Sequence, residues 1–475
     1  MECISVFDML KIGVGPSSSH TLGPWRAAER WIAELKAKAL FEEVVAVRVH
    51  LYGSLSLTGR GHATDAAVLL GLSGADPEYV PVTEIAAIQR AVDVTKQLHL
   101  NGEHFVVFDP ATAVVFHKDF LPFHANGLTF EGRLLDGRVV MGTYYSIGGG
   151  FVVAEERRRA EEVAEQFAEF PYPITTGDEL LAYCAQLRCR VSDVVLANER
   201  TLGTDTEIDY GLQRIWSTML ECMYTGCHTE GTLPGGLGVH RRAASLNRAL
   251  LPGTPTYTNA EEWLKAIRGV EVKFRQILKW VSCFALSVNE VNASMGRVVT
   301  APTNGSAGVI PAVLMYYLTI EDHHGGFEEI KRFLLVASEI GSIFKKGATI
   351  SAAMGGCQAE IGVSSAMAAG ALTELLGGTP PQVLMAAEIA MEHHLGMTCD
   401  PIGGLVQVPC IERNSMGAIK AINAAELALG SDPTHAKVPL DKVVNTMWAT
   451  AKDMSAKYKE TSEGGLAVGV FLSDC

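Results

Sequence analysis

The sequence lacks several features that would assign it to a common class of protein. No Cys-x-x-Cys pair occurs among its ten cysteines, which disfavours zinc ribbons, thioredoxin-like redox motifs and ferredoxin-type cluster motifs. Basic residues are in the minority, with 39 Lys and Arg against 53 Asp and Glu and a formal net charge of −14. Nucleic-acid binding needs a basic surface that displaces phosphate counterions. We therefore expect no nucleic-acid partner.

A secretory leader and a membrane-spanning run are also missing. The N-terminus, MECISVFDMLKIG, has no basic stretch followed by an apolar one. The longest charge-free run lies between Arg297 and Glu321, but prolines and polar residues interrupt it. Only residues 308–320 are mainly apolar, which favours a buried helix over a membrane span. We predict a cytoplasmic protein whose cysteines stay thiols or bind metal.

The chain has 475 residues, which is more than one hydrophobic core ordinarily holds. The spacing of its apolar residues predicts strands and helices in the first part and mainly helices in the second. β-branched runs at 44–52, 105–108 and 138–145 predict strands, and apolar residues at helical spacing predict a helix over 24–40. From Thr176, which forms a capping box with Glu179, the pattern is helical almost throughout.

These patterns predict a two-domain α+β protein. We place an α/β domain at residues 1–160 and a large all-helical domain at residues 176–475. The charged, alanine-rich stretch 155–169 lies between them, followed by Pro171 and Pro173. A surface helix inside one domain is the alternative for this stretch.

Two N-terminal loops are rich in glycine, serine and histidine. Residues 13–21, GVGPSSSHT, precede a predicted helix, and backbone N–H groups and hydroxyls at such a helix start favour an anion such as a carboxylate. The loop matches neither a dinucleotide fingerprint nor a P-loop, and a helix cap without a ligand stays open. Residues 52–62 follow a predicted strand and end at His62, which is either a proton acceptor near neutral pH or a structural histidine.

Three cysteines have unusual surroundings. Cys357 follows Gly355-Gly356, Cys399 precedes Asp400-Pro401, and Cys410 follows Pro409. Glycine beside cysteine lets the backbone approach a bulky group, and proline fixes a turn. The spacing Cys-x41-Cys-x10-Cys is not a general signature. Three thiolates on a four-iron cluster would leave one iron open as a Lewis acid, which suits a dehydration. We interpret the remaining internal cysteines as structural: Cys3, Cys184, Cys189, Cys222, Cys227 and Cys283.

Motifs spread along the chain resemble the bacterial iron–sulfur L-serine dehydratases of the single-chain type. The matching segments keep the order of that family and are Ser5–Asp8, Gly13–Thr21, Tyr52–Leu55, Gly61–His62, Ala301–Gly305, Gly356–Gln358, Cys399–Pro401 and Pro409–Asn414. The resemblance implies conversion of L-serine to pyruvate and ammonia at an active site between the two domains. It also implies that the N-terminal domain is similar to a small-molecule binding domain of some phosphoglycerate dehydrogenases.

The resemblance further implies roles for individual residues. A [4Fe–4S] cluster is expected on Cys357, Cys399 and Cys410, with the serine hydroxyl at the open iron. His62 is our first choice for the base that removes the α-proton, and His20 is expected to assist or orient. The expected substrate contacts are Ser17, Ser18, Ser19, Ser54 and Asn304.

Cys475, the last residue of the sequence, is a further expected ligand. Its thiol and α-carboxylate make it similar to serine with sulfur in place of the hydroxyl, and single-chain members of the family are expected to use such a tail as an internal competitor of substrate. A frayed, exposed terminus is the alternative.

Two other functions remain open at this point. A pyridoxal-phosphate dehydratase would use Thr303–Gly308 as a phosphate loop and Lys345 or Lys346 as the Schiff-base lysine. A non-catalytic iron–sulfur protein would sense serine through its N-terminal domain. We expect L-serine as the small-molecule partner, no membrane partner, and a homodimer.

Overall fold

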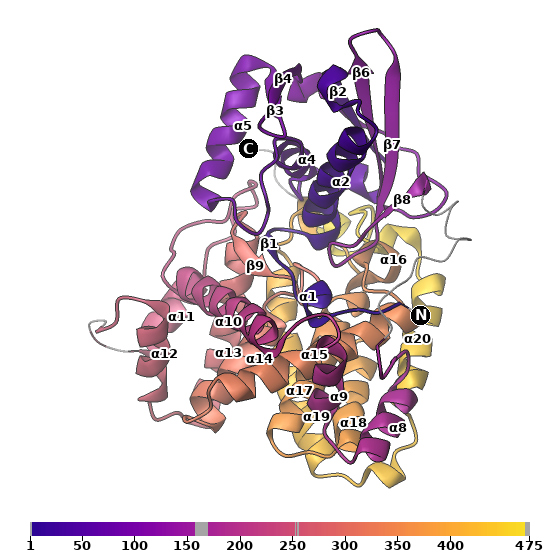
Figure 1. The fold of residues 1–475 in the computed structure, drawn as a ribbon. Helices are drawn as coiled ribbons and strands as arrows, with labels where there is room; N and C mark the ends of the chain where they lie inside the picture. Colours follow the sequence, from indigo (N-terminus) through magenta and orange to yellow (C-terminus); the bar gives the residue numbers. More distant parts are fainter. Residues whose placement is uncertain (1, 157–169, 252, 254–255, 471–475) are drawn as a thin grey trace.

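A computed structural model describes residues 2–156, 170–251, 253 and 256–470. An α/β part built from the N-terminal residues sits on a larger helical part, and the two are in contact along a broad boundary (Figure 1). This agrees with the α+β class predicted from the sequence. Most of the predicted boundary stretch, residues 157–169, lies outside the described residues.

One mixed sheet forms the centre of the α/β part. Its strand order is β3-β4-β2-β6-β7-β8, and β5 also pairs with β2. β2 runs parallel to β4 and β5, and all other pairs in this sheet are antiparallel. The strands are β2 (Val44–Leu51), β3 (Gln97–Leu100), β4 (His104–Val107), β5 (Val114–Phe116), β6 (Gly127–Leu134), β7 (Val139–Ser146) and β8 (Val152–Ala154). The three strands predicted from β-branched runs are confirmed as β2, β4 and β7.

Helices α2 (Gly23–Ala37) and α4 (Thr64–Leu72) cover one face of this sheet. α2 buries apolar residues at helical spacing, and its Trp31 ring stacks on Phe130 of β6 with centroids 5.2 Å apart. A Cβ atom at Gly142 would lie 2.7 Å from Trp31, so glycine lets β7 approach the helix. The remaining helices here are α3 (Ser54–Leu57), α5 (Val82–Thr95) and α6 (Pro110–Ala113).

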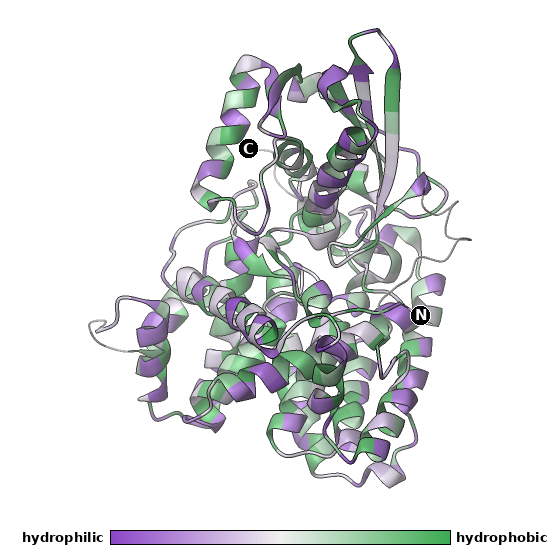
Figure 2. Ribbon diagram, viewed as in Figure 1, coloured by the Kyte–Doolittle hydropathy of each residue, from purple (hydrophilic) through white to green (hydrophobic). Residues whose placement is uncertain are grey.

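The helical part is built around α17 (Ile361–Leu375), and every residue of that helix is buried. Its alanine- and glycine-rich sequence is apolar on all sides, as expected for a central helix. Figure 2 shows hydrophobic residues concentrated in the interior of this part. The other α-helices are α1 (Val6–Met9), α8 (Gly177–Leu187), α9 (Val191–Glu199), α10 (Asp205–Cys227), α11 (Ala243–Leu250), α12 (Ala260–Arg268), α13 (Phe274–Asn292), α14 (Val309–Tyr316), α15 (Phe327–Gly347), α16 (Ala352–Gly355), α18 (Pro380–Glu392), α19 (Cys410–Leu429), α20 (Leu440–Asp453) and α21 (Leu466–Gly469).

The prediction that the second domain is all-helical is wrong at one strand. β9 (Arg297–Val299) pairs antiparallel with β1 (Ile12–Val14), so that Ile12 lies opposite Val299. The pairing joins the start of the chain to the middle of the helical part, a relationship that local periodicity does not report. The two-stranded ladder attaches the N-terminal segment to the helical part immediately before the serine-rich loop.

Two smaller predictions are confirmed. Thr176 caps α8 with the expected capping box to Glu179, and the apolar run after Gly308 forms the buried helix α14. None of the helices in the described ranges is long and apolar enough to cross a membrane.

Candidate active site

The serine-rich loop forms a tight turn between β1 and α2. Residues Ser18–Leu22 make a single π-helical turn, η1, and the Ser17 hydroxyl accepts a hydrogen bond from the backbone N–H of His20 at 3.1 Å. A Cβ atom at Gly15 would lie 2.2 Å from Oδ1 of Asn292, at the end of α13. Glycine at this position therefore lets the loop lie directly against the helical part.

The two predicted histidines come together in this region. The ring centroids of His20 and His62 are 4.5 Å apart, and both side chains are almost fully buried. His62 lies in the turn that follows α3. The structure thus joins two loops that are separated in sequence by α2, β2 and α3.

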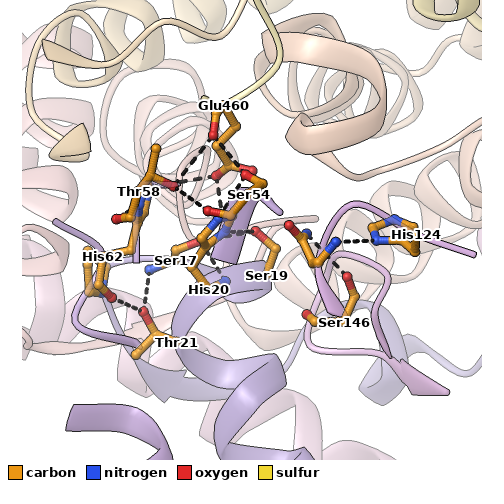
Figure 3. Close-up of polar contacts among 12 residues, drawn as sticks. Ser17, Ser19, His20, Thr21, Ser54, Thr58, His62, His124, Ser146 and Glu460 are labelled. Carbon is orange, nitrogen blue, oxygen red and sulfur yellow. Dashed lines mark hydrogen bonds and ion pairs between the residues drawn. The ribbon is translucent and has the colours of Figure 1, made fainter. Parts of the chain in front are cut away.

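Hydrogen bonds fix the tautomer of His20. The Ser54 hydroxyl donates to the backbone carbonyl of Glu460 at 2.7 Å, so its oxygen must accept from Nε2–H of His20 at 3.1 Å. Nδ1 of His20 is then unprotonated and accepts from the Ser19 hydroxyl at 2.8 Å. Both ring nitrogens of His20 are therefore held by serine hydroxyls (Figure 3).

Among the described residues, one hydrogen bond holds the His62 ring. Its Nδ1–H donates to the backbone carbonyl of Thr58 at 2.9 Å, which leaves Nε2 with a free lone pair. Burial lowers the pKa of His62 to about 4, and burial, with His62 nearby, also lowers the pKa of His20. Both imidazoles are therefore neutral near pH 7, and Nε2 of His62 is the one equipped to accept a proton.

A third buried group, Glu460, is absent from the sequence-based prediction. Its Oε1 lies 3.5 Å from Nδ1 of His20 and 3.6 Å from Nε2 of His62, and Figure 3 shows the residue entering from the C-terminal segment. Burial, with Glu360 and Cys357 nearby, raises its pKa. A hydrogen bond from the Ala353 backbone N–H partly opposes that rise.

The sequence around Glu460 hides its burial. The segment Lys457-Tyr458-Lys459-Glu460 is typical of a solvated surface. Its backbone hydrogen bonds explain the outcome, because Cys399 N–H donates to the Tyr458 carbonyl and Glu460 N–H donates to the Cys399 carbonyl, each at 2.8 Å. Glu460 also has a φ of +57°, a left-handed conformation that is unfavourable for a long side chain.

A second group of polar side chains lies beside the histidines. Nδ1 of His124 accepts from the backbone N–H of Asn126 at 3.1 Å, and the Asn126 amide donates to the Ser146 carbonyl at 3.2 Å (Figure 3). The hydroxyls of Ser18 and Ser146 are buried without a partner among the described residues. Buried hydroxyls normally have hydrogen-bond partners, so these two are available to a polar ligand.

The three predicted cysteine ligands lie at the boundary of the helical part. Cys357 lies in a 3₁₀ turn, Cys399 lies in the loop after α18, and Cys410 begins α19. The Sγ atoms of Cys357 and Cys399 and a carboxyl oxygen of Glu360 all lie within 4.8 Å of one another. Cys410 is not part of this group, and burial, with the charge of Cys357, raises its pKa.

Gly356, beside Cys357, is needed for the close packing of two loops. Gly356 has a φ of +70°, and a Cβ atom there would lie 2.7 Å from the Met397 carbonyl oxygen. That carbonyl accepts from the Gln358 N–H at 3.2 Å. Glycine therefore lets the Cys357 turn pack against the loop that carries Cys399.

A guanidinium group accompanies the thiols. Nη1 of Arg413 donates to Sγ of Cys357 at 3.1 Å and to the Thr398 carbonyl at 2.6 Å. A hydrogen bond from Cys399 and the Arg413 guanidinium lower the pKa of Cys357 to about 7. Buried thiols with a cation beside them are the donor set that suits an anionic iron–sulfur cluster.

The other predicted residues have varied surroundings. The Asn304 amide accepts a hydrogen bond from the Thr300 hydroxyl and donates one to the Val14 carbonyl, so it joins the two parts of the chain. Cys227 and Cys283 have Sγ atoms 3.6 Å apart in the buried helical core, in keeping with a structural interpretation. Cys475 lies outside the described residues.

Comparison with known proteins gives a serine dehydratase family for each half of the chain. The family described as "Serine dehydratase beta chain" matches residues 5–157, and "Serine dehydratase alpha chain" matches residues 186–467. The chain is 47% identical to an L-serine dehydratase of Haemophilus influenzae and 48% identical to one of Streptomyces coelicolor. Each alignment covers 98% of this chain and 99% of the relative. It is 46% identical to L-serine dehydratase 1 of Escherichia coli, with the same coverage.

Proposed function

The chain belongs to the serine dehydratase family, and from that premise we propose that it converts L-serine to pyruvate and ammonia. The observation that carries the proposal is a pair of buried neutral histidines together with the adjacent buried thiols of Cys357 and Cys399. Glu460 connects them, because its carboxyl faces both histidines and its backbone pairs with Cys399.

Cys357, Cys399 and Cys410 would hold a [4Fe–4S] cluster, and the residues present fit one. The thiols are buried, and Arg413 offsets part of the negative charge that such a group brings. When bound, the cluster supplies a Lewis acid for the departing hydroxide. Cys475 stays the predicted additional thiol ligand.

The base in this proposal is His62. Its Nδ1–H is fixed by Thr58, so Nε2 is directed inward with its lone pair free. His20 orients the site, because both of its nitrogens are held by Ser19 and Ser54. Removal of the α-proton and loss of hydroxide give aminoacrylate, which becomes an imine and hydrolyses to pyruvate and ammonia.

The hydroxyl groups of the serine-rich loop orient the substrate in this scheme. Ser18 is the strongest of the three candidates, because its buried hydroxyl has no partner among the described residues. Ser17 and Ser19 are hydrogen-bonded to each other at 3.2 Å and act through His20. Asn304 is a weaker candidate, because its amide is already engaged.

The surroundings of the lysines disfavour a pyridoxal-phosphate enzyme. Lys345 lies over the Phe151 ring, and Nζ of Lys346 donates to the Ile174 carbonyl at 2.6 Å. Within the described part of the chain, no recorded hydrogen bond or ion pair joins either lysine to the 303–308 turn that would have to bind the phosphate.

Pyruvate release under anaerobic conditions tests the proposal. Purified, iron-replete protein is mixed with L-serine, and pyruvate is measured with a coupled dehydrogenase. We expect stoichiometric pyruvate and ammonia, together with broad iron–sulfur absorbance that oxygen bleaches. Serine binding without pyruvate would favour the non-catalytic sensor, and a resolved aldimine band would favour pyridoxal phosphate.

Three finer features remain predictions. They are the domain limits 1–160 and 176–475, the likeness of the N-terminal domain to the small-molecule binding domain of phosphoglycerate dehydrogenases, and the homodimer. Light scattering of the purified protein tests the last of these.

A further inference from the structure

The carboxyl of Glu460 contains a buried oxygen without a partner. Only 4% of the side chain is exposed, yet Oε2 accepts no hydrogen bond from the described residues. A buried carboxyl oxygen without a hydrogen-bond partner is costly, and burial favours the neutral carboxyl until a cation lies beside it. The left-handed backbone at Glu460 adds strain. A ligand that binds Oε2 would explain why the protein keeps both the unpartnered oxygen and the strained backbone.

The position of Glu460 relative to the other groups indicates what that ligand is. Its Oε1 lies 3.6 Å from the free Nε2 of His62. Its backbone N–H donates to the Cys399 carbonyl at 2.8 Å. Glu460 therefore links the proton acceptor to one of the predicted cluster ligands.

The α-carbon of L-serine carries an ammonium group, a carboxylate, a proton and a hydroxymethyl group. If the α-proton faces His62 and the hydroxyl faces the cysteines, the ammonium group and the carboxylate take the two remaining positions. A carboxyl such as Glu460 attracts the ammonium group and repels the carboxylate. An ammonium group buried in a protein requires an anionic or strongly accepting partner. None of the ion pairs recorded for the described residues gives Glu460 a lysine or arginine partner; its recorded neighbours are the two histidines.

The neighbouring carboxyls are less suited to this task. Asp400 already accepts from the Leu466 N–H at 2.6 Å and from Thr398 and Arg413. Glu360 lies within 4.8 Å of two cysteine sulfurs, inside the space of the cluster ligands. Glu460 is the carboxyl that faces the histidines.

We propose that Glu460 accepts the α-ammonium group of L-serine and thereby restricts the site to β-hydroxy acids that carry an amine. This rests on the proposed function. It assigns a substrate-specificity role to a residue in the C-terminal segment. Three of the four substituents on the α-carbon of serine then have a protein counterpart: His62 for the proton, the cysteine site for the hydroxyl, and Glu460 for the ammonium group.

A pair of ligands that differ only in the amine tests this role. The KM for L-serine and the inhibition constant of 3-hydroxypropionate, which is serine without amine, are measured for the wild-type holoenzyme and for Glu460→Gln. We expect the KM for serine to rise at least 10-fold, while the inhibition constant of 3-hydroxypropionate changes less than about threefold. Glu460→Asp, which keeps the charge, should recover part of the affinity.

The controls separate this role from folding and from general catalysis. Glu463→Gln removes an exposed carboxylate from the same C-terminal segment and should leave both constants unchanged. Iron content and circular dichroism of Glu460→Gln should match wild type. Equal loss of affinity for both ligands, or a fall in kcat with the preference for serine intact, would overturn the assignment.

The outcome is also distinguishable from failure of the proposed function. If wild-type protein releases no pyruvate, calorimetric titration with L-serine and 3-hydroxypropionate still compares the two ligands. A wild-type preference for serine that disappears in Glu460→Gln would support the role of Glu460. The same preference in both proteins would refute it.

Discussion

Gly61 packs so closely on Gly404 that a Cβ atom at residue 61 would lie 2.5 Å from the Gly404 carbonyl oxygen. The contact joins the loop that carries His62 to the 3₁₀ turn η5 (Ile402–Gly404), which lies between Cys399 and Cys410. Backbone packing thus sets the separation of the proposed base and the proposed cluster ligands.

Gly61→Ala should therefore impair turnover more than folding. The methyl group must push the two loops apart, and a shift of about 1 Å in a catalytic site costs on the order of 100-fold in rate. We expect kcat/KM for L-serine to fall by at least 10-fold while the circular dichroism spectrum is kept. Gly269→Ala is the matched control, because its nearest neighbour would be 3.4 Å away. Wild-type kinetics in Gly61→Ala would show that the contact has no catalytic importance.

His62→Ala should remove the proton acceptor. General bases contribute about 10²–10⁴-fold to rate, so we expect pyruvate formation to fall within that range while the iron–sulfur absorbance remains. His435→Ala, at an exposed position, serves as the control. Turnover at the wild-type rate in His62→Ala would reject the assignment of the base.

Cys399→Ser should prevent stable cluster assembly. The buried hydroxyl is a poorer ligand for iron than the thiolate, so we expect loss of bound iron, of acid-labile sulfide and of visible absorbance. Cys189→Ser changes a half-buried thiol in the helical part and should leave all three quantities unchanged. Full iron content in Cys399→Ser would remove Cys399 from the ligand set.

Local sequence patterns predicted well those helices and strands that depend on residues close to one another in the sequence. The strands at 44–52 and 138–145, the helix at 24–40 and the capping box at Thr176 depend on neighbours in sequence. β9 was missed because its partner, β1, lies near the start of the chain and is remote in sequence. Long-range pairing leaves no periodic signal in so short a strand.

The residues of the candidate site also fall into a group that the sequence predicts and a group that it does not. Glycine and proline beside the cysteines, and the two histidine loops, were visible because turn residues mark special backbone positions. Glu460 was not, since it follows two lysines in a segment with the composition of a surface loop. Its burial is produced by backbone pairing with Cys399 and by the Ser54 hydroxyl, both contributed by distant segments.

Buried histidines should make the folded state sensitive to acid. Burial lowers the pKa of His394 to about 4 from its ordinary value of 6.5, and its Nδ1–H donates to the Ala390 carbonyl at 2.7 Å. Between these two values the unfolded chain binds a proton that the folded protein does not. Stability is therefore complete above about pH 6.5 and is lost as the pH falls toward 4.

A single histidine of this kind should cost about 2 kcal/mol at pH 5 relative to pH 7.5. His394→Asn keeps a side-chain donor near the helix carbonyl but removes the titrating group. Urea unfolding under anaerobic conditions measures the free energy of unfolding at both pH values. The variant should lose less of it than wild type, and the difference between the two losses should equal the contribution of the histidine. The exposed His435→Asn should follow wild type. Parallel pH profiles of stability for wild type and His394→Asn would contradict the lowered pKa. A group whose pKa differs between the folded and unfolded states must make stability depend on pH.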